Sequence, residues 1–199
     1  IYLIFDICLL LIAIIYAIIK FKKVDGEAWS SEEFDKTIIL ANGPSLKTDI
    51  ERVLKERIGS EVYVLNYFAF TNYFQQIKPE YYLLADRVLW SQHVNDEFRK
   101  DNQKLFFDLD KVDWKMNIVC PEKGFKWVSE RLRENNNIKV LRVNSVNVEF
   151  KSEKINLFAL NQNITTPHFI NGLVMMLWHA IYRKRSNIEI YGADFSLFK

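Results

Sequence analysis

The sequence predicts an α/β protein in which a mostly parallel, doubly wound sheet follows one N-terminal transmembrane helix. From residue 37 onward, short apolar runs of strand length alternate with stretches of helical spacing, the pattern of parallel strands joined by helices that cover both faces of a sheet. Ahead of them, residues 1–19 are almost all Ile, Leu, Ala, Tyr or Phe. We therefore divide the 199 residues into an anchor with a basic flank (1–23), a linker (24–36) and the α/β domain (37–199).

The N-terminal apolar run is nearly long enough, at about 1.5 Å per residue, to cross a hydrocarbon core of about 30 Å. Lys20, Lys22 and Lys23 follow it, and such a basic cluster stays on the cytoplasmic side. The expectation is a single-pass membrane protein whose main domain is cytoplasmic. Asp6 interrupts the run and is expected near the outer interface or against a neighbouring helix. A cleaved signal peptide is the alternative, but no basic segment precedes the run.

Composition excludes some classes of protein. The 27 basic and 25 acidic side chains nearly balance, so charge predicts no nucleic-acid partner. Cys8 and Cys120 allow neither a disulfide framework nor a zinc spacing, which fits a reducing compartment. Because the chain begins with Ile1 and ends with Lys199, shortly after a strand-and-turn signal, we expect a fragment that is open at both ends.

The domain opens with an apolar strand at 37–41, the turn Asn42-Gly43-Pro44-Ser45 and a helix from Leu46. In such sheets a ligand binds outside the carboxyl ends of the strands, where the strand order reverses. Polar residues after strands are therefore candidates for the site. We expect further strands at 62–65, 81–85, 105–107, 118–120, 139–143 and 188–191, and further helices at 68–77, 89–99, 125–135 and 172–182.

The turn at Asn42 to Ser45 is the first candidate. Gly43 lets the backbone approach a ligand closely, Ser45 can cap the following helix, and the helix N-terminus attracts an anion. The turn thus suits a phosphate-bearing ligand, with an ordinary turn and cap as the alternative. Neither a P-loop nor a G-x-G-x-x-G pattern occurs in the sequence.

Three further strand ends carry polar residues. Asn66 could bind a base or ribose edge, or simply form a turn. Asp86 could bind sugar hydroxyls, hold a metal or cap the following helix. Asp194 has the same kind of position after the last strand.

The histidines His93, His168 and His179 show no metal-ligand spacing. His179 lies within an apolar helix and is interpreted as a satisfied core histidine, whereas His168, in a turn-like segment, is a candidate site residue. The basic run 183–185 is interpreted as a solvated helix end, favourable for the helix dipole.

Together these motifs resemble the bacterial sialyltransferases of glycosyltransferase family 42, which extend lipooligosaccharides, from about Thr37 to the end of the chain. That family has an opening strand that runs into A-G-N-G-P-S-L, a second strand ending in asparagine, a third ending in a polar residue, and a closing turn, buried helix and strand ending in G-x-D-F. The corresponding segments here are Ile39 to Leu46, Val64 to Asn66, Asp86, and Asn171-Gly172 through Gly192-Ala193-Asp194-Phe195.

The resemblance implies a Rossmann-like fold and transfer from a nucleotide sugar, with CMP-linked sugars as one case, and no metal or other cofactor. The general base would be a histidine beyond Lys199, so the catalytic residue is unknown, with His168 as the candidate in this chain. The donor-binding residues would be Asn42, Gly43, Ser45, Asn66, Asp86, Asn171, Gly172 and Asp194.

Three positions depart from the family: Asp86 stands in place of asparagine, His168 in place of arginine and Ser196 in place of tyrosine. A carboxylate at position 86 would repel a donor's carboxylate or phosphate, so a donor sugar other than sialic acid is compatible with the sequence.

The same motifs resemble a wider group, the domain of motility accessory factors and archaeal hydroxymethylpterin diphosphokinases. There Mg²⁺-bound ATP would give up diphosphate to a pterin, with Asp86 or Asp194 as metal ligand. A non-catalytic, membrane-attached scaffold is a third alternative. Because a membrane helix suits an envelope substrate, we expect a membrane-anchored glycosyltransferase whose partners are a nucleotide sugar, the membrane and an envelope glycan or lipid-linked acceptor.

Overall fold

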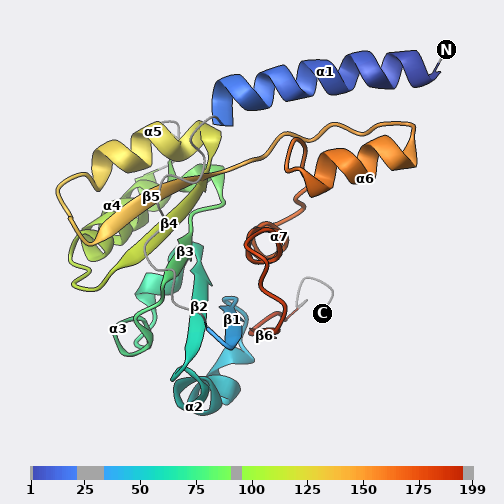
Figure 1. Cartoon of the computed structure of the whole chain (residues 1–199). Helices are drawn as coiled ribbons and strands as arrows, with labels where there is room; N and C mark the ends of the chain where they lie inside the picture. The colour runs from blue at the N-terminus through green and yellow to red at the C-terminus, as the bar shows by residue number, and fades with distance from the viewer. Residues whose placement is uncertain (1, 22–33, 91–95, 195–199) are drawn as a thin grey trace.

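The computed structural model describes residues 2–21, 34–90 and 96–194. Its centre is a six-stranded sheet with the order β5-β4-β3-β2-β1-β6, in which every strand pair is parallel (Figure 1). The predicted α/β class is confirmed. The strands are β1 (Lys36–Leu40), β2 (Ser60–Leu65), β3 (Tyr81–Leu83), β4 (Met116–Pro121), β5 (Ile138–Val143) and β6 (Ile188–Tyr191).

The strand order reverses beside β1. From β1 the chain steps outward to β5, and it then returns past β1 to form β6 on the other side. Leu40 of β1 is therefore paired with Val64 of β2 and with Tyr191 of β6. This reversal brings the turns after β1 and β6 together at the carboxyl edge of the sheet, where ligands bind in open α/β sheets.

Helices cover both faces of the sheet. Alternate strand residues such as Ile38 and Val62 face α2, α4 and α5, whereas Ile39 and Tyr63 face α7. The helices are α1 (Tyr2–Phe21), α2 (Leu46–Glu56), η1 (Asn66–Phe70), α3 (Phe74–Ile77), η2 (Arg87–Leu89), α4 (Asp96–Asp110), α5 (Glu122–Arg131), α6 (Glu153–Asn161) and α7 (Gly172–Tyr182).

Some expected elements differ from the observed ones. The strand predicted at 105–107 is wrong, because these residues belong to α4 and Leu105 and Leu109 are buried at helical spacing. The helix predicted at 68–77 is two short helices, η1 and α3, and α6 was not predicted. The helix expected at 89–99 lies partly outside the described residues.

The N-terminal helix α1 lies beside α6 (Figure 1), with Ala13 buried against Phe150 and Ala159. Across residues 2–21, 34–90 and 96–194, no helix is both long and apolar enough to cross a membrane. The predicted transmembrane helix is therefore not supported. Most of the linker expected at 24–36 lies outside the described residues, and its last residue, Lys36, already begins β1.

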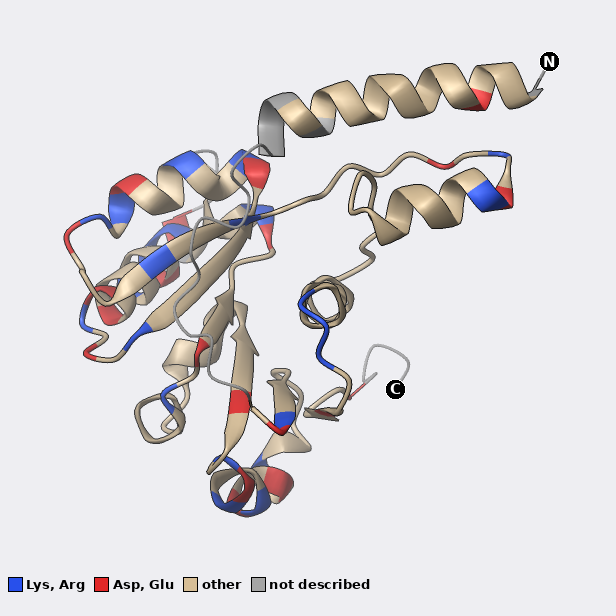
Figure 2. Cartoon of the chain, viewed as in Figure 1, with Lys and Arg blue, Asp and Glu red and all other residues tan. Residues whose placement is uncertain are grey.

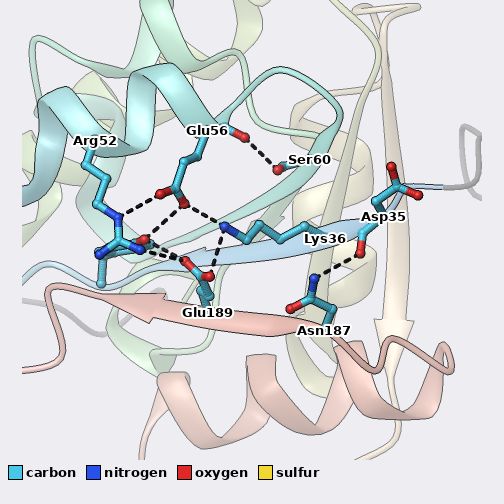
Figure 3. A network of polar contacts seen from close by, with 8 residues as sticks. Asp35, Lys36, Arg52, Glu56, Ser60, Asn187 and Glu189 are labelled. Atoms are coloured by element: carbon cyan, nitrogen blue, oxygen red, sulfur yellow. Dashed lines mark hydrogen bonds and ion pairs between the residues drawn. The ribbon is translucent and has the colours of Figure 1, made fainter.

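An ion-pair network joins the start of β1 to β6 and to the last turn of α2 (Figure 3). Lys36 Nζ lies 2.6 Å from Glu56 Oε2 and 2.9 Å from Glu189 Oε1, and Arg52 Nε lies 2.7 Å from Glu56 Oε1. The hydrogen bonds from Lys36 and Arg52 lower the pKa of the Glu56 carboxyl to about 2. The network therefore reinforces the pairing of β1 with β6 from outside the sheet.

In the basic run after α7 only Lys184 is exposed as expected, because Arg183 and Arg185 pair with a buried carboxylate. Arg183 Nη1 lies 2.9 Å from Glu61 Oε1, and Arg185 Nε lies 2.9 Å from Glu61 Oε2. The Glu61 side chain is fully buried in β2, and a buried carboxylate requires such partners. His179 is buried beside the rings of Tyr63 and Tyr81, but its Nδ1 has no hydrogen-bond partner among the described residues. It is thus a core histidine, but not a satisfied one.

Candidate functional site

The carboxyl ends of β1 and β2 border a cavity of about 680 Å³, a size that suits a small organic ligand. We call it the aromatic pocket. Of the predicted donor-binding residues, Asn42 and Gly43 line it. Its lining residues are Asn42, Gly43, Pro44, Leu46, Lys47, Tyr67, Phe70, Thr71, Asn72 and Tyr73.

The aromatic wall of this pocket was missed by the sequence reasoning. Tyr67 and Phe70 stack with ring centroids 5.4 Å apart, and the Tyr67 hydroxyl donates to Asn102 Oδ1 over 3.0 Å. The Lys104 ammonium lies 4.3 Å from the centroid of Phe70. The signal was the four aromatic residues within 66–73, directly after a strand that ends at the ligand-binding edge.

Gly43 is required by the protein's own packing. Its N–H donates to Gly192 O over 2.8 Å, and a Cβ at position 43 would lie 2.3 Å from Asp194 Oδ2 and 2.4 Å from Gly192 O. The predicted close approach at this glycine is therefore made by the turn after β6, which fills the space beside the backbone.

Asp194 takes the position that we expected for an anion. Its Oδ2 accepts a hydrogen bond from the Ser45 N–H over 2.7 Å, at the start of α2. The Ser45 side chain makes no capping hydrogen bond, so the predicted serine cap is wrong. A carboxylate of the protein already complements the positive end of the α2 dipole.

A row of polar side chains crosses the ends of β1, β2 and β3. Asn42 Nδ2 donates to Leu65 O over 3.1 Å. Asn66, which has a left-handed backbone with φ 51°, donates from Nδ2 to Asp86 Oδ2 over 2.7 Å and accepts from the Ala85 N–H over 3.1 Å. Although Asp86 is open to solvent on one side, partial burial raises the pKa of its carboxyl. The structure thus brings together Asn42, Asn66 and Asp86, as expected; we call them the polar row.

The start of α7 lies against this row. Asn171 Oδ1 accepts from the Val174 N–H over 3.0 Å and so caps the helix. A Cβ at Gly172 would lie 3.0 Å from Ala85 Cβ and 3.7 Å from Asn66 Nδ2. Gly172 therefore borders the polar row, and the absence of a side chain there allows α7 to begin so close to it.

His168 has a different neighbour. It is exposed, and its Nδ1 lies 2.9 Å from Asn147 Nδ2, in the segment after β5. Within the part of the chain that the structure describes, no hydrogen bond joins His168 to the polar row.

No group of three His, Cys, Asp or Glu side chains within the described parts of the chain could hold a metal ion. Asp86 follows β3 and Asp194 follows β6, with β2 and β1 between those strands. Their two strands are three spacings of about 4.8 Å apart in the sheet.

No protein-family model matches the chain, and no curated protein matches it.

Proposed function

We propose that this protein is a glycosyltransferase that moves a sugar from a nucleotide-sugar donor to the hydroxyl of an acceptor. The observation that carries the proposal is the adjacency of the aromatic pocket and the polar row at one edge of the sheet. The first suits a nucleotide and the second a sugar. The resemblance of residues 39–46 and of Gly192 to Phe195 to sialyltransferases of family 42 supports the same reaction.

The nucleotide would lie in the aromatic pocket. Tyr67 and Phe70 offer ring faces on which a base can stack, an interaction that contributes about 1 to 3 kcal/mol per base. Lys47, from α2, also lines the pocket and would supply positive charge to the donor's phosphate. Because Asp194 occupies the Ser45 N–H, the Lys47 side chain is a better phosphate partner than the backbone N–H groups at the start of α2.

The donor sugar would lie along the polar row. The Asp86 carboxylate would accept hydrogen bonds from sugar hydroxyls, and charge-assisted bonds of this kind are about twice as strong as neutral ones. A neutral, hydroxyl-rich sugar suits this carboxylate better than an acidic one, because like charges repel.

In the reaction, a general base removes the proton of the acceptor hydroxyl, whose oxygen bonds to the anomeric carbon while the bond from that carbon to the phosphate oxygen breaks. The nucleotide leaves with the bonding electron pair. His168 is the candidate base in this chain, and a histidine beyond Lys199 is the one that the family resemblance implies. Membrane attachment and an envelope acceptor remain predictions from the sequence.

A thermal-shift titration of the protein with CMP, CDP, UDP, GDP and ATP, each with and without Mg²⁺, tests the proposal. We expect one or more of the sugar-carrying nucleotides, CMP among them, to raise Tm without metal. Phe70→Ala should abolish the shift, whereas Phe107→Ala, an exposed aromatic residue on α4 outside the pocket, should keep it. Stabilisation by ATP with Mg²⁺ alone would instead support a diphosphokinase, and no shift with any nucleotide would support a scaffold.

A further inference from the structure

A second cavity, of about 480 Å³, lies at the same edge of the sheet, beyond the ends of β4 and β5 and against α1. We call it the α1 cavity. The cavity has two walls: α1 forms an apolar wall, and the segments that follow β4 and β5 form a mainly polar wall. The first consists of Leu9, Ile12, Ala13 and Tyr16, and the second of Glu122, Lys123, Ser145, Val146, Asn147 and Val148.

We propose that the α1 cavity binds an amphipathic acceptor lipid, with the start of its hydrocarbon chain against α1 and its hydroxylated head group against the segments after β4 and β5. That the lipid is the acceptor rests on the proposed transferase function. That the cavity binds a lipid stands on the cavity alone.

The apolar wall is held in place by contacts far along the chain. Asp6 is 1% exposed, and its carboxylate accepts hydrogen bonds from the Ser152 N–H over 2.6 Å and the Lys151 N–H over 3.3 Å, at the start of α6. One helical turn beyond Leu9, Ala13 is buried against Phe150. These contacts fix the face of α1 that borders the cavity.

The surface outside the cavity favours a hydrocarbon chain over a fully polar ligand. The side chains of Leu11 and Ile15, next to the lining residues, are 54% and 57% exposed. Between residues 3 and 16 the one charged residue of α1 is Asp6, whereas α2, α4 and α5 contain many charged residues (Figure 2). A chain that leaves the cavity along α1 therefore stays on apolar surface, where each buried CH₂ adds to binding.

The polar wall favours a neutral, hydroxylated head group. Glu122 Oε2 lies 3.3 Å from Arg142 Nη1, and Lys123 lies beside it in the lining, so both signs of charge are present. Ser145 and Asn147 supply groups that both donate and accept hydrogen bonds, which matches a sugar or alcohol. Asn147 is also the residue that contacts His168, the candidate base.

The order of the strands aligns the three regions. The aromatic pocket lies at β1 and β2, the polar row reaches β3, and the α1 cavity lies at β4 and β5. From β2 to β4 is two strand spacings, roughly 10 Å. A donor whose base lies in the aromatic pocket would thus point its sugar along the polar row toward the head group of the lipid.

Isothermal titration with octyl, decyl and dodecyl β-maltoside, each below its critical micelle concentration, tests the inference. We expect affinity to rise about three- to fourfold for each added CH₂. Ile12→Asp should lower the affinity for dodecyl maltoside at least tenfold. Ile12→Ala, a milder change that serves if the charged variant does not fold, should lower it several-fold. Ile58→Asp, an 88% exposed position away from α1 and from the cavity, is the control and should bind as the parent does.

Affinity that is independent of chain length, or equal losses in the Ile58 and Ile12 variants, would overturn the inference. The two proposals fail separately. If maltosides bind at Ile12 but no nucleotide raises Tm, the lipid site stands and the transferase function falls. If nucleotides raise Tm and maltosides do not bind, the transferase function stands and the α1 cavity is not its acceptor site.

Discussion

The Asp194 carboxylate accepts a hydrogen bond from the backbone N–H of Ser45 over 2.7 Å, across 149 residues of sequence. The contact closes the β6 turn over the first turn of α2, at the place where the strand order reverses. It stabilises the helix by capping it, and it also puts a negative charge beside the aromatic pocket, where the proposed donor would carry its phosphate.

Asp194→Asn should separate these two effects. The amide oxygen can still accept from the Ser45 N–H, so the free energy of unfolding should fall by no more than about 1 kcal/mol. Removal of the charge should tighten nucleotide binding, because a nearby repulsion is lost. Denaturant unfolding and calorimetric titration with CMP measure both. Weaker CMP binding in this variant, with its fold intact, would mean that the carboxylate helps the ligand instead of opposing it.

Gly43→Ala should destabilise the protein more than Gly59→Ala. The first variant places a Cβ 2.3 Å from Asp194 Oδ2 and 2.4 Å from Gly192 O, and such overpacking costs about 1 to 3 kcal/mol or more. The second meets no atom within 4 Å and strains only the backbone, at φ 77°, which costs about 1 kcal/mol. Equal losses in urea unfolding would show that the turn after β6 moves aside freely.

The fold was largely predictable because the strands and helices that make it are locally encoded. Helix 172–182 and strand 188–191 were confirmed at their predicted bounds, since an apolar periodicity of one type fills each of them. Helix α6 was missed because its N-terminus is capped by Asp6, a partner 146 residues away that no local pattern reveals. The aromatic wall was missed because short 3₁₀ and α turns carry no clear period.

The same distinction applies to the candidate site. Asn42, Asn66 and Asp86 lie beyond the ends of β1, β2 and β3 at one edge of the sheet, a location that follows from the parallel order of strands. The contact of Asp194 with Ser45 depends on which strand lies beside β1. The residues near Asp194 and Ser45 do not predict this strand order.

Asp86→Asn should alter the choice of donor. Asp86 is open to solvent on one side, so the change in the free energy of unfolding should stay within about 0.5 kcal/mol. The amide removes the negative charge, so under the proposed function it should weaken binding of a neutral-sugar donor such as UDP-glucose and strengthen binding of CMP-sialic acid. Calorimetric titration of both donors with both proteins checks this. Unchanged affinities would place the sugar away from the polar row.

His179 should make the protein sensitive to mild acid. Burial, together with the charge of Arg183, lowers the pKa of His179 to about 3 from the ordinary 6.5. Between these two values the unfolded chain binds a proton that the folded chain does not. Stability is therefore complete above pH 6.5 and falls on acidification by about 1.4 kcal/mol per pH unit from this residue.

His179→Leu should remove that slope, and stability at pH 7 should be equal or higher because the unpaired Nδ1 is lost. Urea unfolding at pH 7, 6, 5 and 4 measures it. The exposed His168 provides the comparison, since His168→Leu should leave the acid slope in place. A slope that persists in His179→Leu must come from other groups.

Glu61→Gln should be strongly destabilising. The change leaves Arg183 and Arg185 facing an uncharged group in a site where the Glu61 side chain is fully buried, and breaking a buried pair in this way costs about 3 to 5 kcal/mol. Glu130→Gln breaks an exposed pair with Lys126 and should change stability by less than about 1 kcal/mol. Similar effects of the two substitutions would mean that water reaches the ion pairs of Glu61 with Arg183 and Arg185 in solution.

The contact of Asp6 with Ser152 cannot form until the chain between these residues has been synthesised. Ribosomes add about 5 to 20 residues per second, so the 146 residues between the two partners take roughly 7 to 30 s to emerge. During that interval α1 has left the ribosome but its carboxylate and its apolar side chains have no α6 to dock against. The newborn chain is therefore most exposed to aggregation, and most open to capture by a chaperone, before α6 has been made.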